Sequence, residues 1–396
     1  MKVLVFMSQF YQLSGAERLA VELAEDLNKR GVHADILSMY TEDLPGVTEA
    51  KESLLQKGIP AVHFLGMRIH PPALSMIPAI RKLRQLIREQ EYDVIETSMT
   101  SPTTIASWAT RATRARHVAG IHDVFQRDRE NSWRHKFWRF SVRCNRSIRY
   151  YAISDHAANR WVTYSKTSPR HTRRIYNAIP DDCFDATPER SAIRKELGIP
   201  ENGRIALYVG RIAKRKGIDT LLNAVGPFLE QENLFLLYAG LPDLNAKGTR
   251  EMLAAVELQV AAATWSSRVR FLGHRNDIPR LMASSDILVH PPRIEGFGLV
   301  LAEALAAGLP VVASNVDGIP EVLAGTDSVM VPPDDPDALR EAVLQTLNRT
   351  REETDAANEK ARIRAEDFRI ARRTDQMMEL FQDVLQTRVY ANGPVE

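Results

Sequence analysis

The chain has 396 residues, a formal net charge of +2, 44% hydrophobic residues and 26% charged residues, which is ordinary for globular domains. Its length exceeds what one hydrophobic core usually organises, so we expect two domains. Two cysteines, Cys144 and Cys183, are too few for a disulfide framework in a chain of this length. No apolar run approaches the roughly 20 residues of a membrane-spanning helix, and the short apolar start at 1–7 indicates a buried strand rather than a secretion signal. We therefore expect a cytoplasmic protein, with peripheral association at the inner membrane face left open.

Strand-like runs alternate with helix-like patterns through the first half of the chain. Such alternation predicts a parallel sheet with helices on both faces. The predicted strands are 3–7, 34–39, 62–65, 93–97, 117–121, 150–153 and 173–176, and the predicted helices include 16–29, 77–89 and 156–164.

A polar stretch at 180–189 interrupts the alternation, which restarts near residue 204. Ligands of doubly wound sheets bind at the carboxyl ends of the strands, so we expect two Rossmann-like domains that face each other across a deep cleft. Further strands are predicted at 204–210, 234–239, 269–272, 287–290, 311–313 and 328–331, followed by helical sequence from 336 to about 386. The predicted divisions are a first domain at 1–182, a linker at 183–203, a second domain at 204–366, and a C-terminal helix at 367–396 that packs back on the first domain.

The segment 293–305 carries the most specific signal. Gly296 and Gly298 let the backbone approach a ligand closely, and a helix is expected to begin near Leu299. The free amides of a helix N-terminus favour an anion such as a diphosphate. Glu295 and Glu303 flank this turn, and their carboxylates suit the hydroxyls of a sugar and of a ribose. The alternative is that the glycines only shape a turn and the glutamates are solvated.

This segment resembles the Glu-x7-Glu motif of the retaining glycosyltransferase family 4, which has the GT-B fold of two Rossmann-like domains. The likeness continues through 307–314 and 318–322. In that family the residue matching Glu295 contacts hydroxyls of the donor sugar, and the residue matching Glu303 holds the ribose. The resemblance also implies donor binding through the backbone at Gly296, Phe297, Gly298, Leu299 and Val300.

The loop after the strand at 204–210 carries two cations, Arg211 and Lys216. Cations at this position could stabilise the negative charge that develops on a departing diphosphate, and no metal is needed for that role. The match to a Gly-Arg…Lys-Gly segment of the family implies that both residues bind the diphosphate, although Lys214 and Arg215 leave the register open. A solvated basic loop is the alternative.

Two positions of the first domain also match the family. Gly15 follows the first strand and opens a helix, where nearby amides can face a phosphate. It matches the second glycine of a Gly-Gly-Ala-Glu segment, with Ser14 in place of the first, although Ser14 could simply cap the helix. His122 ends the strand at 117–121, and the resemblance implies that it contacts the donor sugar, with Asp123 either orienting it or bonding locally.

Base recognition is expected near His274, Arg275 and Asn276, after the predicted strand at 269–272. The identity of these side chains does not predict whether the base is uracil or guanine. We favour a UDP-sugar as the donor and keep a GDP-sugar open.

Positive charge is concentrated between Arg111 and Arg174, where sixteen Lys and Arg residues stand against four Asp and Glu residues, a balance of +12. Such asymmetry favours an anionic partner. The stretch 127–149 mixes cations with aromatic residues and could associate with an anionic membrane surface, or Phe137, Phe140 and Cys144 could be buried against the sheet. We expect a glycan or lipid-linked acceptor, and no nucleic acid, because no recognition motif accompanies the charge.

The resulting prediction is a retaining glycosyltransferase that uses no metal and no cofactor and moves a sugar from a nucleotide-diphosphate sugar. Its same-face reaction is implied by the resemblance alone. One alternative is a nucleotide-sugar epimerase, which needs an additional acid/base set that we do not identify. The other is a non-catalytic nucleotide-sugar-binding protein. The joint presence of all the residues that match the family argues against a non-catalytic protein. These residues are Gly15, His122, Arg211, Lys216, Glu295 and Glu303.

Overall fold

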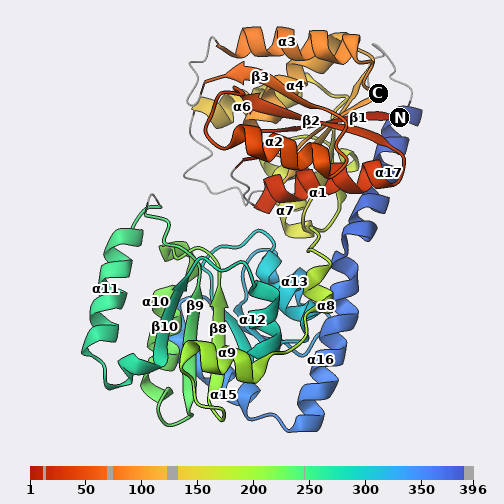
Figure 1. The fold of residues 1–396 in the computed structure, drawn as a ribbon. Coiled ribbons are helices and arrows are strands. Elements are labelled where there is room, and N and C mark those ends of the chain that lie inside the picture. Colours follow the sequence, from red (N-terminus) through yellow and green to blue (C-terminus); the bar gives the residue numbers. More distant parts are fainter. Residues whose placement is uncertain (12–14, 69–74, 123–132, 245, 388–396) are drawn as a thin grey trace. The chain divides into compact units, whose positions relative to one another are not determined.

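The computed structural model describes residues 1–11, 15–68, 75–122, 133–244 and 246–387 of the chain. It divides into two compact units, Met1–Ala178 with Ile370–Glu396, and Ile179–Arg369 (Figure 1). Each unit contains one parallel sheet covered by helices. This arrangement confirms the predicted class of two Rossmann-like domains.

The sheet of the first unit has seven parallel strands in the order β3-β2-β1-β4-β5-β6-β7. The central strand β1 is buried along Val3–Met7, because a strand covered on both faces needs apolar residues on both. The strand order reverses between β1 and β4, where ligands of such sheets bind. The strands are β1 (Lys2–Met7), β2 (His33–Tyr40), β3 (Val62–Met67), β4 (Val94–Thr97), β5 (Arg116–Ile121), β6 (Arg149–Ala152) and β7 (Thr172–Arg174).

The last described helix, α17, packs on the first unit. Met377 and Phe381 are fully buried in the core that includes Leu23 of α1. Arg373 of the same helix donates from Nη1 to the carbonyl of Leu19 at 3.1 Å. The helices of this unit are α1 (Gly15–Lys29), α2 (Val47–Gln56), α3 (Met76–Glu89), α4 (Thr100–Ala109), α6 (Trp133–Cys144), α7 (Asp155–Ser165) and α17 (Ile370–Gln386).

The helix α6 lies within the basic stretch, of which residues 127–132 fall outside the described ranges. It buries Trp138 and Val142, and the Trp138 ring lies 5.0 Å from that of Trp161. Phe137 and Phe140 are 38% and 56% exposed. The alternative prediction, in which these two phenylalanines are buried, is therefore wrong. The face of α6 that packs on the core is the one with Trp138 and Val142. Across the described ranges, no helix is both long and apolar enough to cross a bilayer.

A buried carboxylate, Asp35 of β2, is held by three side chains of the first unit. Tyr92 Oη donates to Asp35 Oδ2 at 2.5 Å, and His33 Nε2 lies 3.0 Å from the same oxygen. His63 Nε2 is 3.1 Å from Tyr92 Oη. His63 Nε2 also lies 3.9 Å from Asp35 Oδ2. Burial alone would raise the pKa of Asp35, but the interaction with His63 and the hydrogen bonds of Tyr92 and His33 outweigh it and lower this pKa to about 2.

We expect Asp35→Asn to reduce the free energy of unfolding by about 2 kcal/mol at pH 7. Because the folded pKa is depressed, this stabilisation is complete above the unfolded value of 3.8 and is lost as the pH falls toward about 2. The penalty should shrink to about half at pH 3. Urea unfolding followed by tryptophan fluorescence measures it, since four of the five tryptophans lie in the first unit. Glu52→Gln, at an exposed position of α2, is the control, and an equal Asp35 penalty at both pH values would contradict the account.

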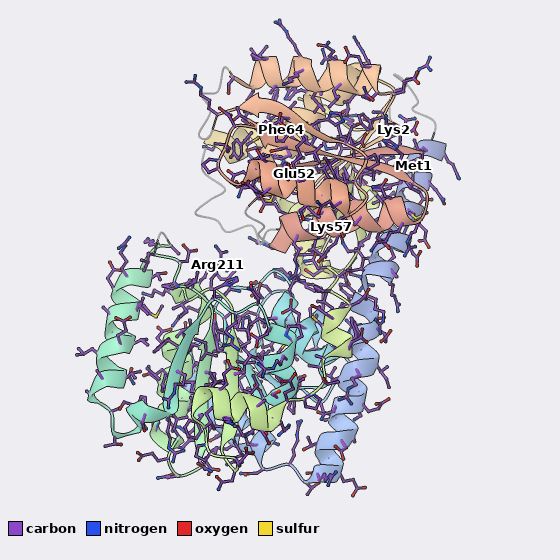
Figure 2. All side chains as sticks on the ribbon, in the orientation of Figure 1. Met1, Lys2, Glu52, Lys57, Phe64 and Arg211 are labelled. Atoms are coloured by element: carbon purple, nitrogen blue, oxygen red, sulfur yellow. The ribbon has the colours of Figure 1, made fainter. Side chains whose placement is uncertain are left out.

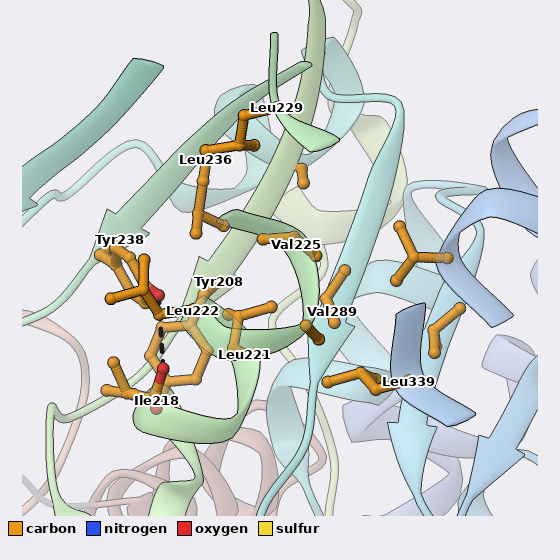
Figure 3. Close-up of a cluster of buried hydrophobic side chains, with 14 of the residues drawn as sticks. Tyr208, Ile218, Leu221, Leu222, Val225, Leu229, Leu236, Tyr238, Val289 and Leu339 are labelled. Atoms are coloured by element: carbon orange, nitrogen blue, oxygen red, sulfur yellow. Dashed lines mark hydrogen bonds between the residues drawn. The ribbon is translucent and has the colours of Figure 1, made fainter. Parts of the chain in front are cut away.

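The sheet of the second unit has six parallel strands in the order β10-β9-β8-β11-β12-β13, which reverses between β8 and β11. Tyr208 and Tyr238 of neighbouring strands pack with the apolar face of α10 (Ile218–Val225) (Figure 3). Tyr238 Oη also donates to the carbonyl of Ile218 at 3.5 Å, so a buried hydroxyl is satisfied. The strands are β8 (Arg204–Val209), β9 (Leu234–Ala239), β10 (Val269–Gly273), β11 (Ile287–His290), β12 (Val311–Ser314) and β13 (Val329–Val331).

The segment 183–203, predicted as a linker, belongs instead to the second unit. Its helix α9 inserts the buried Arg194, whose Nη2 pairs with Asp286 Oδ2 at 3.1 Å and whose Nε donates to the carbonyl of Gly203 at 3.0 Å. A paired guanidinium can be buried, so a polar segment can still pack. The helices of this unit are α8 (Asp182–Asp185), α9 (Arg190–Leu197), α10 (Ile218–Val225), α11 (Thr249–Ala262), α12 (Ile278–Ser284), α13 (Leu299–Ala306), α14 (Ile319–Val322), α15 (Pro336–Leu347) and α16 (Arg351–Ala365).

Candidate active site

The loops that follow β8 and β11 lie together because these strands are neighbours at the reversal of strand order. The amide of Arg293 donates to the carbonyl of Arg215 at 2.9 Å. The guanidinium of Arg293 binds both carboxylate oxygens of Asp219, each at 2.9 Å. A bidentate pair fixes geometry as well as charge, so the two loops hold one another in place.

Gly217 lets these loops approach closely. Its φ of +69° is in the left-handed region, and a Cβ built there would lie 1.8 Å from the carbonyl oxygen of Pro291. No other residue type can be accommodated without displacing the backbone. Lys216 directly precedes this glycine, at the end of the short helical turn η4 (Lys214–Lys216), so its position depends on the contact.

Lys216 and Glu295 form an ion pair at the end of the sheet, between Lys216 Nζ and Glu295 Oε2, with side chains only 13% and 14% exposed. His290 Nε2 lies 3.3 Å from the same carboxylate oxygen. Burial works to raise the pKa of Glu295, but the charge of Lys216 and the hydrogen bond of His290 prevail and hold this pKa below its usual range. Burial lowers the pKa of His290, so the site presents an ionised carboxylate beside one ammonium and a neutral imidazole.

The backbone of Glu295 is held on both sides by the loop between β12 and α14. The amide of Glu295 donates to Asp317 Oδ2 at 3.0 Å, and the amide of Gly318 donates to the carbonyl of Glu295 at 3.2 Å. His290, Arg293 and Asp317 are additions that sequence reasoning missed. Arg293 and Asp317 meet partners 74 and 22 residues away, and no local motif marks such contacts. His290 stands only five residues before Glu295, at the end of β11.

The helix α13 begins at Leu299, as predicted, directly after Gly298 with a φ of +83°. The first amides of a helix have no partner within it and favour an anion. Phe297 is buried, with its ring edge-on to Phe368 at 5.5 Å, so only its backbone is available to a ligand. Glu303 lies half-buried in α13, and the turn at Gly296 leads into the same helix.

Arg211 follows β8 and is labelled in Figure 2. Its side chain is 64% exposed, and its Nη1 pairs with Asp243 Oδ2 at 3.1 Å. The structure therefore brings Lys216 and Glu295 together but pairs Arg211 with a different carboxylate.

The residues predicted to read the base follow β10, at the edge of the sheet. His274 and Asn276 are exposed. The guanidinium of Arg275 binds both oxygens of Asp277, at 2.8 and 2.7 Å, and Glu196 Oε1 at 2.8 Å. This ion-pair network joins α9 to the loop after β10, so the Arg275 side chain has a structural role here. The base-binding role of the three residues stays a prediction.

In the first unit, Gly15 begins α1 after β1, and His122 directly follows β5. His122 Nε2 lies 3.3 Å from Tyr151 Oη. Burial, and secondarily the charge of Arg373, lower the pKa of His122 to about 3. The imidazole is therefore neutral near pH 7. It can donate one hydrogen bond and accept another without contributing charge. Ser14 and Asp123, which were considered beside these positions, lie outside the described residues.

Within the described ranges, no three His, Cys, Asp or Glu side chains are grouped so as to hold a metal ion. The metal-independent reaction and the absence of a cofactor stay predictions.

Two family models match the chain and together span most of it. The model described as "Glycosyltransferase Family 4" matches residues 13–182, and the model described as "Glycosyl transferases group 1" matches residues 189–364. The first range contains β2 to β7 of the first sheet, and the second contains β8 to β13 together with Lys216, Glu295 and Glu303.

Curated relatives carry glycosyltransferase names. The D-inositol 3-phosphate glycosyltransferase of Corynebacterium efficiens is 39% identical over 171 residues, 41% of this chain and 38% of that protein. The phosphatidyl-myo-inositol mannosyltransferase of Mycobacterium leprae is 28% identical over 391 residues, 93% of each chain. The chain spans only about half the length of several curated relatives that it matches, with 44%, 38% and 56% covered for three of them.

A solved structure with the same architecture is Anabaena Alr3699/HepE in complex with UDP. It has a TM-score of 0.80 and 23% identity, and the match covers 97% of this chain and 100% of that one. At this identity the likeness supports the fold alone. With both sheets matched by the family models, the chain belongs to the family 4 glycosyltransferases (glycosyl transferases group 1), which are transferase enzymes with the GT-B fold.

Proposed function

We propose that this glycosyltransferase uses a nucleotide-diphosphate sugar as donor, favouring a UDP-sugar, and transfers the sugar with retention of configuration and without a metal ion. The observation that carries the proposal is the ion pair of Lys216 and Glu295. It lies where the strand order of the second sheet reverses, beside the N-terminus of α13.

Each group of this site suits one part of such a donor. The ionised carboxylate of Glu295 can only accept hydrogen bonds, which matches it to sugar hydroxyls. The ammonium of Lys216 has three donors, so it can hold Glu295 and still donate to a phosphate oxygen. The amides at the start of α13 supply further donors for the diphosphate, and Glu303 in the same helix is proposed to hold the ribose.

The reaction breaks the bond between the anomeric carbon and the diphosphate oxygen, and the electron pair leaves with that oxygen. The acceptor oxygen bonds to the anomeric carbon on the same face, and its proton passes to the departing diphosphate. Lys216 and the exposed Arg211 would stabilise the charge that develops there. His122 of the first unit is proposed as a neutral hydrogen-bonding contact to the donor sugar.

Two observations support the choice of donor and acceptor. Anabaena Alr3699/HepE, which shares the fold, has been crystallised with UDP and with UDP-glucose, so we place a UDP-sugar before a GDP-sugar among the donors to be tested. The exposed Phe137 and Phe140 of α6 lie beside exposed Lys136 and Arg143, a combination that suits an anionic lipid surface. We therefore propose an anionic, lipid-linked or glycan acceptor and peripheral binding to the membrane.

Calorimetric titration with UDP-glucose, GDP-mannose and ADP-glucose in the presence of EDTA tests the donor site. One nucleotide class should bind with micromolar affinity, and Glu295→Ala and Arg211→Ala should each weaken binding by at least about tenfold, or 1.4 kcal/mol. Glu341→Ala and Arg351→Ala, at exposed positions of α15 and α16, are the matched controls and should bind as the native chain does.

Failure of all three nucleotide sugars to bind would contradict the donor site. Binding followed by an epimerised product would favour the epimerase alternative. Binding without transfer to any acceptor and without slow hydrolysis would favour a non-catalytic binding protein.

A further inference from the structure

His122 lies against a buried polar network in the first unit. Tyr151 Oη of β6 and Ser98 Oγ, just after β4, both donate to Glu96 Oε1 at 2.7 Å. His122 Nε2 lies 3.3 Å from Tyr151 Oη, with the two rings perpendicular. Glu96 and Tyr151 are fully buried, so water does not compete for these hydrogen bonds and each proton has a defined place.

The sheet is built to allow this contact. Glu96, His122 and Tyr151 lie on or directly after β4, β5 and β6, which are consecutive neighbours in the sheet. Gly120 of β5 stands between them. A Cβ at this position would lie 2.4 Å from Tyr151 Oη and 2.8 Å from His122 Nε2. Any larger residue would therefore separate the tyrosine from the histidine.

The protons of the network decide which nitrogen of His122 carries hydrogen. The tyrosine hydroxyl has one proton. Its contact with Glu96 Oε1, at 2.7 Å, is shorter than its contact with Ser98 Oγ, at 3.2 Å, so the proton is assigned to Glu96. Two hydroxyls converge on this oxygen, so it is an acceptor whether or not the other carboxyl oxygen is protonated. Tyr151 Oη can then only accept from His122, which requires a proton on Nε2. A neutral imidazole has one N–H, so Nδ1 of His122 is left with its lone pair.

A charged side chain also lies against the network, on the helix α17. Arg373 of α17 is buried, and its guanidinium carbon lies 5.9 Å from the centre of the Tyr151 ring. A cation so close opposes a second positive charge on the imidazole. Burial lowers the pKa of His122 most, and this charge adds to the effect. The imidazole is therefore neutral, and its tautomer follows from the contact with Tyr151.

We propose that Tyr151, held by Glu96, is a positioning residue that fixes His122 as the Nε2–H tautomer and presents Nδ1 as a hydrogen-bond acceptor. This inference rests on the proposed donor contact of His122. It specifies that contact: Nδ1 receives a hydrogen bond from a hydroxyl group of the donor sugar. A donor sugar with no hydroxyl facing Nδ1 would leave this nitrogen without a hydrogen bond.

Two-bond ¹H–¹⁵N correlation spectra of the full chain, labelled with ¹⁵N-histidine, read the tautomer directly at pH 7. The signals of His122 are identified by their loss in His122→Gln. The native chain should show Nδ1 at the downfield position of an unprotonated nitrogen. Tyr151→Phe removes the acceptor and should yield a mixture of tautomers. Glu96→Met frees the tyrosine proton for donation to His122 Nε2 or to Ser98 Oγ, which lie 3.3 and 3.2 Å from Tyr151 Oη, and should shift the tautomer toward Nδ1–H.

Tyr150→Phe is the matched control, because Tyr150 is the adjacent residue of β6 and its buried hydroxyl has no hydrogen-bond partner among the described residues. It should leave the His122 signals unchanged. A native Nδ1–H tautomer, or an unchanged tautomer in both Tyr151→Phe and Glu96→Met, would overturn the proposal. The spectra need no nucleotide sugar, so this failure is distinct from a failure of donor binding in the titration.

Discussion

Replacing Lys216 with methionine should lower kcat/KM for sugar transfer by about 10²–10³-fold, the usual cost of removing one preorganised group that stabilises developing charge. Methionine keeps much of the apolar length of the side chain, and both residues lie in a largely buried environment. The substitution therefore removes mainly the ammonium that faces Glu295 and, in the proposed reaction, the departing diphosphate.

The same substitution should move the acid limb of the pH–rate profile to higher pH. The charge of Lys216 is the largest of the effects that lower the pKa of Glu295 against the opposing effect of burial. Without that charge the pKa of Glu295 rises, and the carboxylate becomes protonated at a higher pH. Initial rates of transfer between pH 4 and pH 9 measure this shift.

Lys214→Met is the matched control, because Lys214 lies in the same helical turn but is exposed. It should change neither the rate nor the profile. The double variant Lys216→Met/Glu295→Gln should lose less than the two single penalties combined, since residues in direct contact are not additive. Additive penalties, or an unmoved acid limb, would contradict the role assigned to the pair.

The strands were predictable because they are buried on both faces and therefore read as continuous apolar runs. The prediction at 234–239 matches β9, and that at 3–7 differs from β1 by one residue. The helix Thr100–Ala109 was not among the predicted elements. Threonine and serine are poor helix formers, and the helix is stabilised by tertiary burial of residues such as Ile105 and Ala106, which its local sequence does not reveal.

The site was predictable only where a local motif carries it. Glu295, Glu303, Gly298 and Lys216 stand in motifs, and the structure pairs Lys216 with Glu295 across 79 residues. Asp317, which holds the amide of Glu295, comes from another loop and has no such signal. The contact between Tyr151 and Glu96 spans 55 residues, so only the neighbouring positions of β4, β5 and β6 reveal it.

The second large effect is expected at Gly217. Gly217→Ala should reduce the free energy of unfolding by about 3 kcal/mol or more, through the left-handed backbone and the forced overlap with the neighbouring loop. The overlap involves backbone, because the added Cβ would lie 1.8 Å from the carbonyl oxygen of Pro291. A rotamer change cannot relieve it. The loops after β8 and β11 would have to separate, which moves Lys216 away from Glu295 and should also abolish measurable transfer.

Gly198→Ala separates the two causes. Gly198 has nearly the same backbone conformation, with φ +64° against +69°, but a Cβ there would have nothing within 4 Å. Only the left-handed strain applies, so we expect a penalty of about 1 kcal/mol and no change in transfer rate. Urea unfolding followed by circular dichroism, together with transfer rates, measures both variants. An equal loss of unfolding free energy in both variants would show that the loops can separate at little cost. In that case the close approach of Gly217 to Pro291 does not position Lys216.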